Sequence, residues 1–252
     1  MILIKNAQEI EAMRRSGKIL SSIMHEVGKK IAPGVNTLEL DKLASELVFS
    51  NGGRAVFKGY GEKNNPYPAS ICASLNSEIV HGIPSAEKII KVGDLVKIDM
   101  GIEIDGLITD MARTFEVGAV TSVARCLMDA TREALNEGIG KIKAGARLSE
   151  YSRAVEDYVK VRGFSVVRDL VGHGVGRELH EDPQIPNYVW KQKDIILQEG
   201  MTLALEPMIN EGTHYIKILA DQWTYATKDG KLSAHFEDTV VVRKGGCEIL
   251  TR

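Results

Sequence analysis

Two aspartates, Asp99 and Asp110, lie on either side of the dipeptide Asp105-Gly106 within a stretch of β-forming residues. An Asp-Gly dipeptide in this setting favours a two-residue turn, so we expect a β-hairpin in which Ile104 pairs with Leu107. That register makes the two aspartates diagonal neighbours on one face of the sheet, about 7–8 Å apart at the backbone. Two buried like charges at this spacing need a shared proton or cation. The hairpin therefore predicts one wall of a metal site.

An internal repeat leads to a second wall. An ungapped alignment matches residues 91–99 (KVGDLVKID) with residues 198–206 (QEGMTLALE), so that Asp99 corresponds to Glu206. Each segment is preceded by the same order of elements: a long amphipathic helix, a turn that ends in glycine, and a second helix. The two turns lie 111 residues apart in the chain. We expect a single catalytic domain, 1–252, made of two related α+β halves, about 1–118 and 119–252, that share one sheet.

The second half offers two glutamates in strand-like surroundings. Glu206 ends the apolar run MTLALE, and Glu237 lies in SAHFEDTVVV. Both are expected to be buried, and a buried glutamate needs a partner. For any single glutamate a salt bridge to Lys or Arg is at least as common as a metal. Four such acids, with no Lys or Arg patterned to meet them, favour a metal.

Histidines near these segments extend the set. His173 and His180 lie in the Gly-rich stretch DLVGHGVGRELHEDP, and His81 follows an apolar run in EIVHGIP. An imidazole between two glycines, as at His173, lies where the backbone can approach a ligand closely. Taken alone, each histidine is more often structural. One imidazole with four carboxylates forms an oxygen-rich set that suits Mn, Fe, Co or Zn and could hold two ions.

Length, charge and cysteine usage narrow the protein class. The chain has 252 residues, 32 basic and 34 acidic, and a net charge of −2, which gives no general attraction to nucleic acid or anionic membranes. Its three cysteines have no CxxC spacing, so neither a disulfide framework nor a thiolate zinc site is expected. We find no signal peptide, no apolar run long enough to span a membrane, and no G-x-S-x-G, H-E-x-x-H or P-loop motif. These features predict a cytoplasmic protein.

Helix signals precede the hairpin. Asn6 followed by Glu9 has the spacing of a capping box, and apolar residues then recur at helical intervals. A second helix is expected from about Thr37 and should end at Asn51-Gly52. Two such helices ahead of the hairpin predict an α/β (α+β) fold.

Five motifs, in this order and spacing, resemble type I methionine aminopeptidases over nearly the whole chain: EIVHGIP, VKIDMGIEIDGLITDMARTF, VGHGVGRELHEDP, MTLALEPM and AHFEDT. The resemblance implies the pita-bread fold, in which two pseudo-symmetric halves surround a curved, mainly antiparallel sheet with helices outside. It also implies a dinuclear metal centre whose ligands are Asp99, Asp110, His173, Glu206 and Glu237. Only the resemblance selects His173 rather than His180 as the ligand.

The activity implied by the resemblance is removal of the N-terminal methionine from nascent proteins and peptides. Two divalent ions (Co, Mn, Fe or Zn) would lower the pKa of a shared water and polarise the scissile carbonyl. Glu206 would act as the general base, and His81 and His180 would contact the substrate amide and stabilise the tetrahedral intermediate. The expected partners are the N-termini of nascent polypeptides, with the ribosome as a candidate docking partner, and we expect a monomer.

An apolar pocket for an unbranched side chain is also implied. By resemblance its lining comprises Phe57, Tyr60, Tyr67, Cys72, Leu179 and Trp223. Phe57 stands where a cysteine often occurs, Leu179 stands where an aromatic residue often occurs, and the stretch from Tyr60 to Tyr67 is longer than in the bacterial pattern. We therefore expect an apolar pocket of altered shape.

Two alternatives remain open. X-Pro dipeptidases and aminopeptidases resemble this fold and ligand set, although they usually carry an extra N-terminal domain. Some pita-bread proteins are non-catalytic binding modules that have lost metal ligands, whereas all five ligand positions are filled here.

Overall fold

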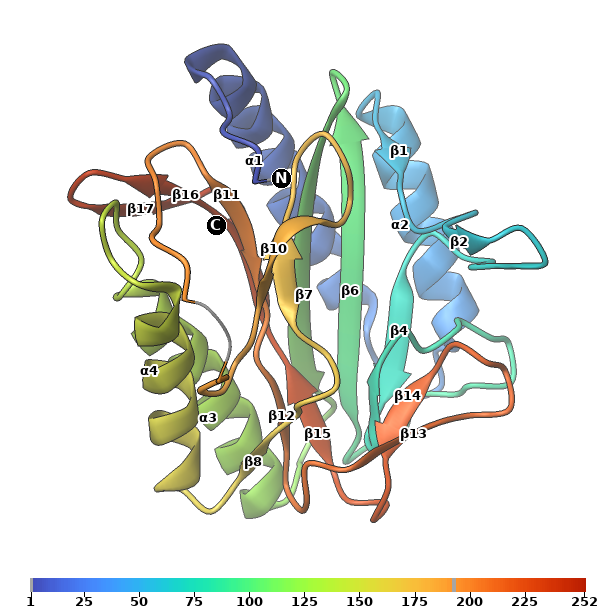
Figure 1. Cartoon of the computed structure of the whole chain (residues 1–252). Helices are drawn as coiled ribbons and strands as arrows, with labels where there is room; N and C mark the ends of the chain where they lie inside the picture. Colours follow the sequence, from blue (N-terminus) through green and yellow to red (C-terminus); the bar gives the residue numbers. More distant parts are fainter. Residues whose placement is uncertain (1, 192–193) are drawn as a thin grey trace.

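The predicted hairpin runs through the centre of the structure, a computed structural model that describes residues 2–191 and 194–252 (Figure 1). Strand β6 (Leu95–Ile104) pairs antiparallel with β7 (Leu107–Glu116) in the predicted register, with Asp99 opposite Ala112. In the turn, Asp105-Gly106 has φ values of 54° and 75°, as a type I′ turn requires. Both the hairpin and its register are confirmed.

A curled antiparallel sheet is built around this hairpin. Within the described ranges it has nine strands, in the order β1-β6-β7-β16-β11-β9-β10, with β4 paired to β6 and β17 paired to β16. The other strands of this sheet are β1 (Arg54–Ala55), β4 (Cys72–Leu75), β9 (Gly172–Gly174), β10 (Glu181–Ile185), β11 (Thr202–Leu205), β16 (Glu237–Arg243) and β17 (Gly246–Ile249). Strands from both halves of the chain therefore lie side by side, because β7 pairs with β16.

Short strands outside the main sheet shape its open side. One group comprises β8 (Ser165–Val166), β12 (Met208–Asn210) and β15 (Ser233–His235), and another comprises β5 (Glu78–Val80), β13 (Ile216–Ile218) and β14 (Tyr225–Thr227). The long stretch between Tyr60 and Tyr67 forms a small hairpin of β2 (Gly61–Glu62) and β3 (Asn65–Pro66). These pieces border the predicted site.

Four helices occupy the described part of the chain: α1 (Ala7–Lys30), α2 (Thr37–Ser50), α3 (Ser122–Ile139) and α4 (Leu148–Lys160). At the start of α1, the Asn6 side chain accepts the backbone N–H of Gln8 and of Glu9, and the Glu9 carboxylate accepts the N–H of Asn6. The predicted capping box is confirmed, as is the second helix beginning at Thr37. None of the helices in residues 2–191 and 194–252 combines the length and apolarity needed to cross a membrane.

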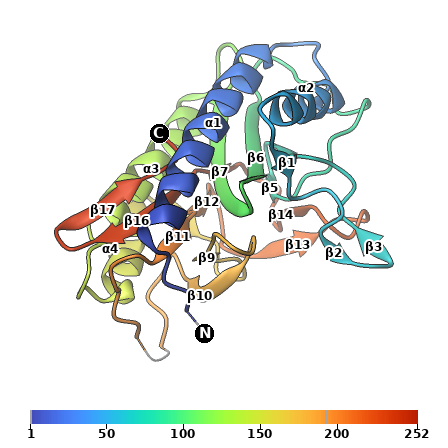
Figure 2. The same ribbon diagram turned by 90° about the horizontal axis from the view of Figure 1, so that it is seen from above.

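The helices pack on one face of the sheet and leave the other face free for the site. Figure 2 shows α1, α2 and α3 on one side of the hairpin, with β10, β13 and the β2–β3 hairpin on the other. Successive residues of a strand point to opposite faces. On β6, Val96, Ile98 and Met100 therefore pack with α1 and α2, and Asp99 points away from them.

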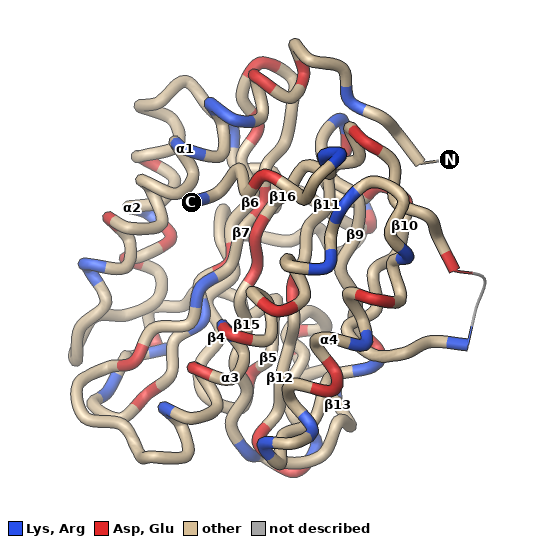
Figure 3. Tube along the Cα trace, turned by 90° about the vertical axis from the view of Figure 1, so that its left-hand side faces the viewer, with Lys and Arg blue, Asp and Glu red and all other residues tan. Residues whose placement is uncertain are grey.

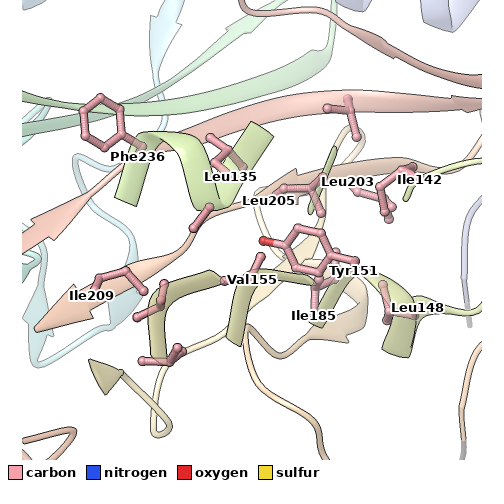
Figure 4. Packing of buried hydrophobic residues seen from close by; sticks show 14 of the residues in the cluster. Leu135, Ile142, Leu148, Tyr151, Val155, Ile185, Leu203, Leu205, Ile209 and Phe236 are labelled. Atoms are coloured by element: carbon pink, nitrogen blue, oxygen red, sulfur yellow. The ribbon is translucent and has the colours of Figure 1, made fainter. Parts of the chain in front are cut away.

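A second core lies between α3, α4 and the sheet (Figure 4). Tyr151 and Val155 of α4 pack with Leu203 and Leu205 of β11, all of them buried. The two helices approach closely because α3 has Gly138, where an added Cβ would lie 2.5 Å from the Tyr151 ring. This core fixes β11, the strand that leads directly into Glu206.

Candidate metal centre

The sheet arranges the predicted ligands in two rows. In the first row, Asp99 on β6 and Glu237 on β16 both lie opposite Ala112 on β7, one from each side. Strand β11 pairs with β16 in a register that, continued by one residue, brings Glu206 alongside Glu237. Three carboxylates from three strands thus share one line across the sheet.

The second row lies two residues further along each strand and therefore on the same face. There Asp110 is opposite Gly101, and His173 is opposite Ala204. Small residues separate the acids: an added Cβ on Gly101 would lie 3.3 Å from Asp110 Oδ1 and 2.7 Å from the Val56 side chain. Glycine and alanine at these positions leave room for the charged side chains to converge.

A single cavity collects the predicted site residues. It is lined by all thirteen of them: Phe57, Tyr60, Tyr67, Cys72, His81, Asp99, Asp110, His173, Leu179, His180, Glu206, Trp223 and Glu237. Ligand atoms of Asp110, His173 and Glu237 lie within 4.8 Å of one another. Asp99 and Glu206 line the same cavity but lie outside this tightest group.

The four carboxylates lack compensating charge from the protein. Asp99 Oδ1, Asp110 Oδ1 and Glu237 Oε1 are buried without a hydrogen-bond partner. Within residues 2–191 and 194–252, none of the four carboxylates forms an ion pair with Lys or Arg. Glu206 lies within ion-pair distance of histidines only. Burial raises the pKa of all four, that of Asp110 to about 7, and repulsion among them adds to the shift for the other three. The cluster is suited to a bound cation.

Glu206 is less buried than its apolar strand predicts. Its side chain is 13% exposed, whereas Glu237 is buried. The reason is its position just beyond the end of β11, where the chain borders the cavity. The carboxylate therefore remains open to small molecules that enter.

The histidine geometry fits a metal ligand. His173 Nδ1 donates to the carbonyl of Gly174 at 2.9 Å, which leaves Nε2 without a proton in the neutral ring. That Nε2 lies 3.5 Å from Glu206 Oε1. Burial lowers the pKa of His173 to about 3, so the ring is neutral at pH 7. The lone pair on His173 Nε2 and the Glu206 carboxylate would repel each other unless a cation lies between them.

The glycines beside His173 lie close against neighbouring strands. An added Cβ on Gly172 would lie 2.4 Å from the carbonyl oxygen of Ala204, and one on Gly174 would lie 2.3 Å from that of Asp182. They make room for the neighbouring strands β11 and β10. Close approach of the backbone to a ligand stays a prediction.

His81 and His180 line the same cavity as the carboxylates. His81 has a φ of 59°, a conformation that is uncommon for a side-chain-bearing residue. Its buried Nδ1 has no partner, and burial lowers its pKa to about 4. His180 Nδ1 lies 2.5 Å from the Tyr60 hydroxyl, and burial lowers its pKa as well. Both imidazoles are therefore neutral at pH 7.

Apolar and aromatic side chains complete the cavity. Phe57, Tyr67, Cys72 and Leu179 are buried. The Tyr67 hydroxyl donates to the carbonyls of Ile71 and Gly82, which fixes its ring against Trp223, with centroids 5.2 Å apart. The β2–β3 hairpin packs against Trp223: an added Cβ on Gly61 would lie 2.6 Å from that ring. The longer stretch thus leaves Tyr60 in the lining.

Two supporting residues were missed in the sequence. The Thr239 hydroxyl donates to the carbonyl of Asp110 and accepts its N–H, at 2.8 and 3.0 Å. Buried Asn187 donates to the carbonyl of Glu206 at 3.1 Å and accepts the Tyr151 hydroxyl at 2.7 Å. Neither has a sequence signal, because a threonine in a strand and an asparagine in a loop are both ordinary.

Comparison with known proteins gives a consistent result. A sequence profile described as metallopeptidase family M24 matches residues 11–244. The methionine aminopeptidase of Clostridium perfringens is 45% identical over 252 residues, which cover 100% of this chain and 99% of that protein. The crystal structure of a methionine aminopeptidase from Thermotoga maritima has a TM-score of 0.96 and 44% identity, with full coverage of both chains.

A more distant structure places the fold in a wider group. An Xaa-Pro dipeptidase from Bacillus anthracis has a TM-score of 0.78 and 25% identity, covering 99% of this chain and 62% of that one. The curled antiparallel sheet with its helices is thus the pita-bread fold, as the resemblance implied. The chain belongs to metallopeptidase family M24, among its bacterial type I methionine aminopeptidases.

Proposed function

We propose that this protein removes the N-terminal methionine from nascent proteins and peptides. The observation that carries the proposal is a cluster of four carboxylates, three of them buried and Glu206 open to the cavity, without a Lys or Arg partner in the described residues and next to an apolar recess in the same cavity. Figure 3 shows acidic segments, in red, near the labels of β7 and β16. Relatives named methionine aminopeptidases, which match the chain over its full length, support the choice of substrate.

The residues present fit a dinuclear metal centre. Asp99, Asp110, His173, Glu206 and Glu237 would hold two divalent ions, for which Co, Mn, Fe and Zn are the candidates. When bound, the ions supply a hydroxide nucleophile near neutral pH and polarise the scissile carbonyl. Glu206, which is partly exposed to the cavity, would take a proton as the general base.

His180 and His81 are suited to hold the substrate amide. When the Tyr60 hydroxyl donates to His180 Nδ1, the neutral ring carries its proton on Nε2. That N–H can donate to the substrate carbonyl and to the oxyanion that forms from it. His81, with a buried Nδ1 that lacks a partner in the described structure, offers a second polar contact. Both side chains act as fixed, neutral hydrogen-bonding groups.

Specificity for an N-terminal methionine follows from two properties of the cavity. The free α-amino group, which an internal peptide bond lacks, would bind one of the two ions. The unbranched side chain would occupy the recess lined by Phe57, Tyr60, Tyr67, Cys72, Leu179 and Trp223. Aromatic rings and a thiol suit a flexible thioether.

The proposal includes one catalytic domain made of two related halves that meet near residue 118. Equivalent backbone hydrogen bonds support it: the N–H of Gly34 donates to the carbonyl of Ile90, and the N–H of Gly145 donates to that of Leu197, both at 2.9 Å. We further propose that the enzyme is a cytoplasmic monomer that acts on chains as they leave the ribosome. Sedimentation of the purified protein, with and without ribosomes, tests these last two points.

A metal add-back assay tests the activity. The protein is stripped of metal, supplied with Mn, Co, Fe or Zn, and assayed on Met-Ala-Ser and on Ala-Pro peptides. We expect release of methionine only with metal, and loss of that release in Glu206→Ala. Preferred cleavage of the Ala-Pro peptide would assign an X-Pro peptidase, which shares the fold at 25% identity. Failure to cleave either peptide would favour a binding protein.

A further inference from the structure

The segment before α1 places a lysine inside the protein. The Lys5 side chain is 0% exposed, and its Nζ forms an ion pair with Glu181, whose side chain is 3% exposed. Backbone contacts fix the segment: the N–H of Lys5 donates to the carbonyl of Gly200 at 2.9 Å, and Ile4 bridges Met201. Burying two charges is costly unless further hydrogen bonds satisfy them. The buried pair therefore needs further hydrogen-bond partners.

Glu181 uses its second oxygen to close a turn. Oε1 accepts the backbone N–H of Arg177 at 2.7 Å and that of Glu178 at 3.1 Å, and Oε2 faces Lys5. The turn closed in this way carries Leu179 and His180, which line the cavity. One carboxylate therefore links the buried lysine to the backbone of a site loop.

The lysine stem also lies against the start of this loop. An added Cβ on Gly176 would be 2.4 Å from Lys5 Cε. The other charged groups near Lys5 are Arg177 and Glu9, which pair with each other at 2.8 Å on the surface. Lys5 is thus the buried cation that faces the Glu181 carboxylate, and the Arg177–Glu9 pair is a separate, exposed contact of the same loop.

His180 depends on accurate placement of this loop. Its Nδ1 lies 2.5 Å from the Tyr60 hydroxyl, and its ring meets that of His173 edge to face, with centroids 4.3 Å apart. A shift of the loop by a fraction of an ångström would disturb both contacts. A misplacement of about 1 Å can lower the rate of an enzyme reaction about 100-fold.

We propose that the buried Lys5–Glu181 pair positions His180, with the Glu181 side chain as the acceptor that holds the turn and Lys5 as the cation that compensates the charge of Glu181. The Lys5 ammonium group compensates the charge of the Glu181 carboxylate. The carboxylate accepts the two backbone N–H groups and so holds the turn that presents His180 to the substrate. Lys5 does not line the cavity. The inference rests on the proposed function, because it assumes that His180 contacts the substrate.

A matched pair of double variants tests the inference. Lys5→Met/Glu181→Gln retains an acceptor oxygen for the two N–H groups without a buried charge. Lys5→Met/Glu181→Leu fills the same space but has no acceptor, and replacing a buried ion pair by apolar side chains often leaves stability intact. We expect kcat for methionine release to stay within about threefold of wild type in the Gln variant and to fall about tenfold in the Leu variant, with little change in KM.

A double-mutant cycle shows whether the loss passes through His180. Adding His180→Ala to the Leu variant should slow the reaction no further than His180→Ala alone, because the positioned group is already absent. The same Leu variant combined with Trp223→Leu, on a different loop, should show multiplied losses. Arg177→Met, which removes only the exposed pair with Glu9, should stay within about twofold of wild type.

The outcomes separate this inference from the proposed function. If the wild-type enzyme releases methionine but the Leu variant is as fast as the Gln variant, or its loss multiplies with that of His180→Ala, the acceptor at position 181 does not position His180 and the inference fails. If the metal-loaded wild-type enzyme does not release methionine, the proposed function itself fails. Thermal unfolding of both double variants, expected to be similar, excludes a general loss of stability as the cause.

Discussion

Glu237 and Asp238 are neighbours on β16 with opposite surroundings. Both are buried, and they point to opposite faces of the sheet. Asp238 is met by Arg113 Nη2 at 2.6 Å, by the Thr251 hydroxyl at 2.9 Å and by Arg252 Nε at 2.9 Å. Glu237 faces the cavity, where Oε1 has no hydrogen-bond partner.

The difference shows how the fold treats a buried acid on each face. On the helix side, the chain itself provides the positive charge for Asp238, so that carboxylate belongs to the folded structure. On the cavity side, Glu237 lies among other acids, and burial together with repulsion from Asp110 and Glu206 raises its pKa well above the ordinary value. The counter-charge there has to come from outside the chain. We therefore expect the two positions to respond oppositely to substitution.

Glu237→Gln should give the largest effect. The change removes a proposed metal ligand, and we expect methionine release to fall about 10³-fold at a fixed metal concentration. The metal-free variant should be at least as stable as the metal-free wild type, because one of several repelling acids has gone. Steady-state kinetics and thermal unfolding without metal measure the two effects. A variant that keeps its activity but unfolds more easily would place Glu237 with Asp238 as a structural acid.

Metal binding should also raise the free energy of unfolding of the wild-type protein. A ligand that binds only the folded state contributes about 4 kcal/mol at a free concentration of 1,000 times its Kd, which shifts the unfolding temperature by roughly 10 °C in a protein of this size. Calorimetric unfolding with and without a chelator measures the shift. Asp238→Asn should retain it and Glu237→Gln should lose most of it. Equal shifts in these two variants would contradict the contrast between the faces.

Asp238→Asn should reduce stability rather than activity. The change leaves Arg113 and Arg252 without their shared carboxylate, and breaking a buried pair typically costs 3–5 kcal/mol. Their side chains are 20% and 42% exposed, so water can replace part of the interaction, and we expect about 2–3 kcal/mol. Denaturant unfolding measures the change. A hundredfold loss of metal affinity with unchanged stability would reverse the assignment.

Several metal-ligand positions could be predicted from the sequence because strand geometry is regular. The turn at Asp105-Gly106 determined the register that sets Asp99 and Asp110 on one face, and the segments that align, 91–99 and 198–206, led to Glu206. Alternation along a strand is a strict rule, so one correct turn locates every side chain in the hairpin.

Side chains whose partners are distant in sequence could not be found in this way. His173 was distinguished from His180 only by family resemblance, and the structure adds that a ring nitrogen of His173 lies within 4.8 Å of carboxylate oxygens of Asp110 and Glu237. The ion pair of Lys5 with Glu181 joins residues 176 positions apart, and no local pattern indicates it. Such contacts depend on the packing of complete elements, which periodicity does not describe.

The pH dependence of metal affinity gives the smallest and most specific test of the contrast. Asp110 has its pKa raised to about 7, and Asp99, Glu206 and Glu237 are also raised, so the metal-free cluster holds protons that must leave when metal binds. His173, with a pKa lowered to about 3, is already neutral and releases none in this range. Affinity should therefore rise with pH between about 6 and 8, tenfold per pH unit for each proton displaced. Titration calorimetry in two buffers of different ionisation enthalpy counts these protons. Asp238→Asn should release as many as wild type and Glu237→Gln fewer, and an affinity that does not change over this range would show that the cavity acids are already ionised without metal.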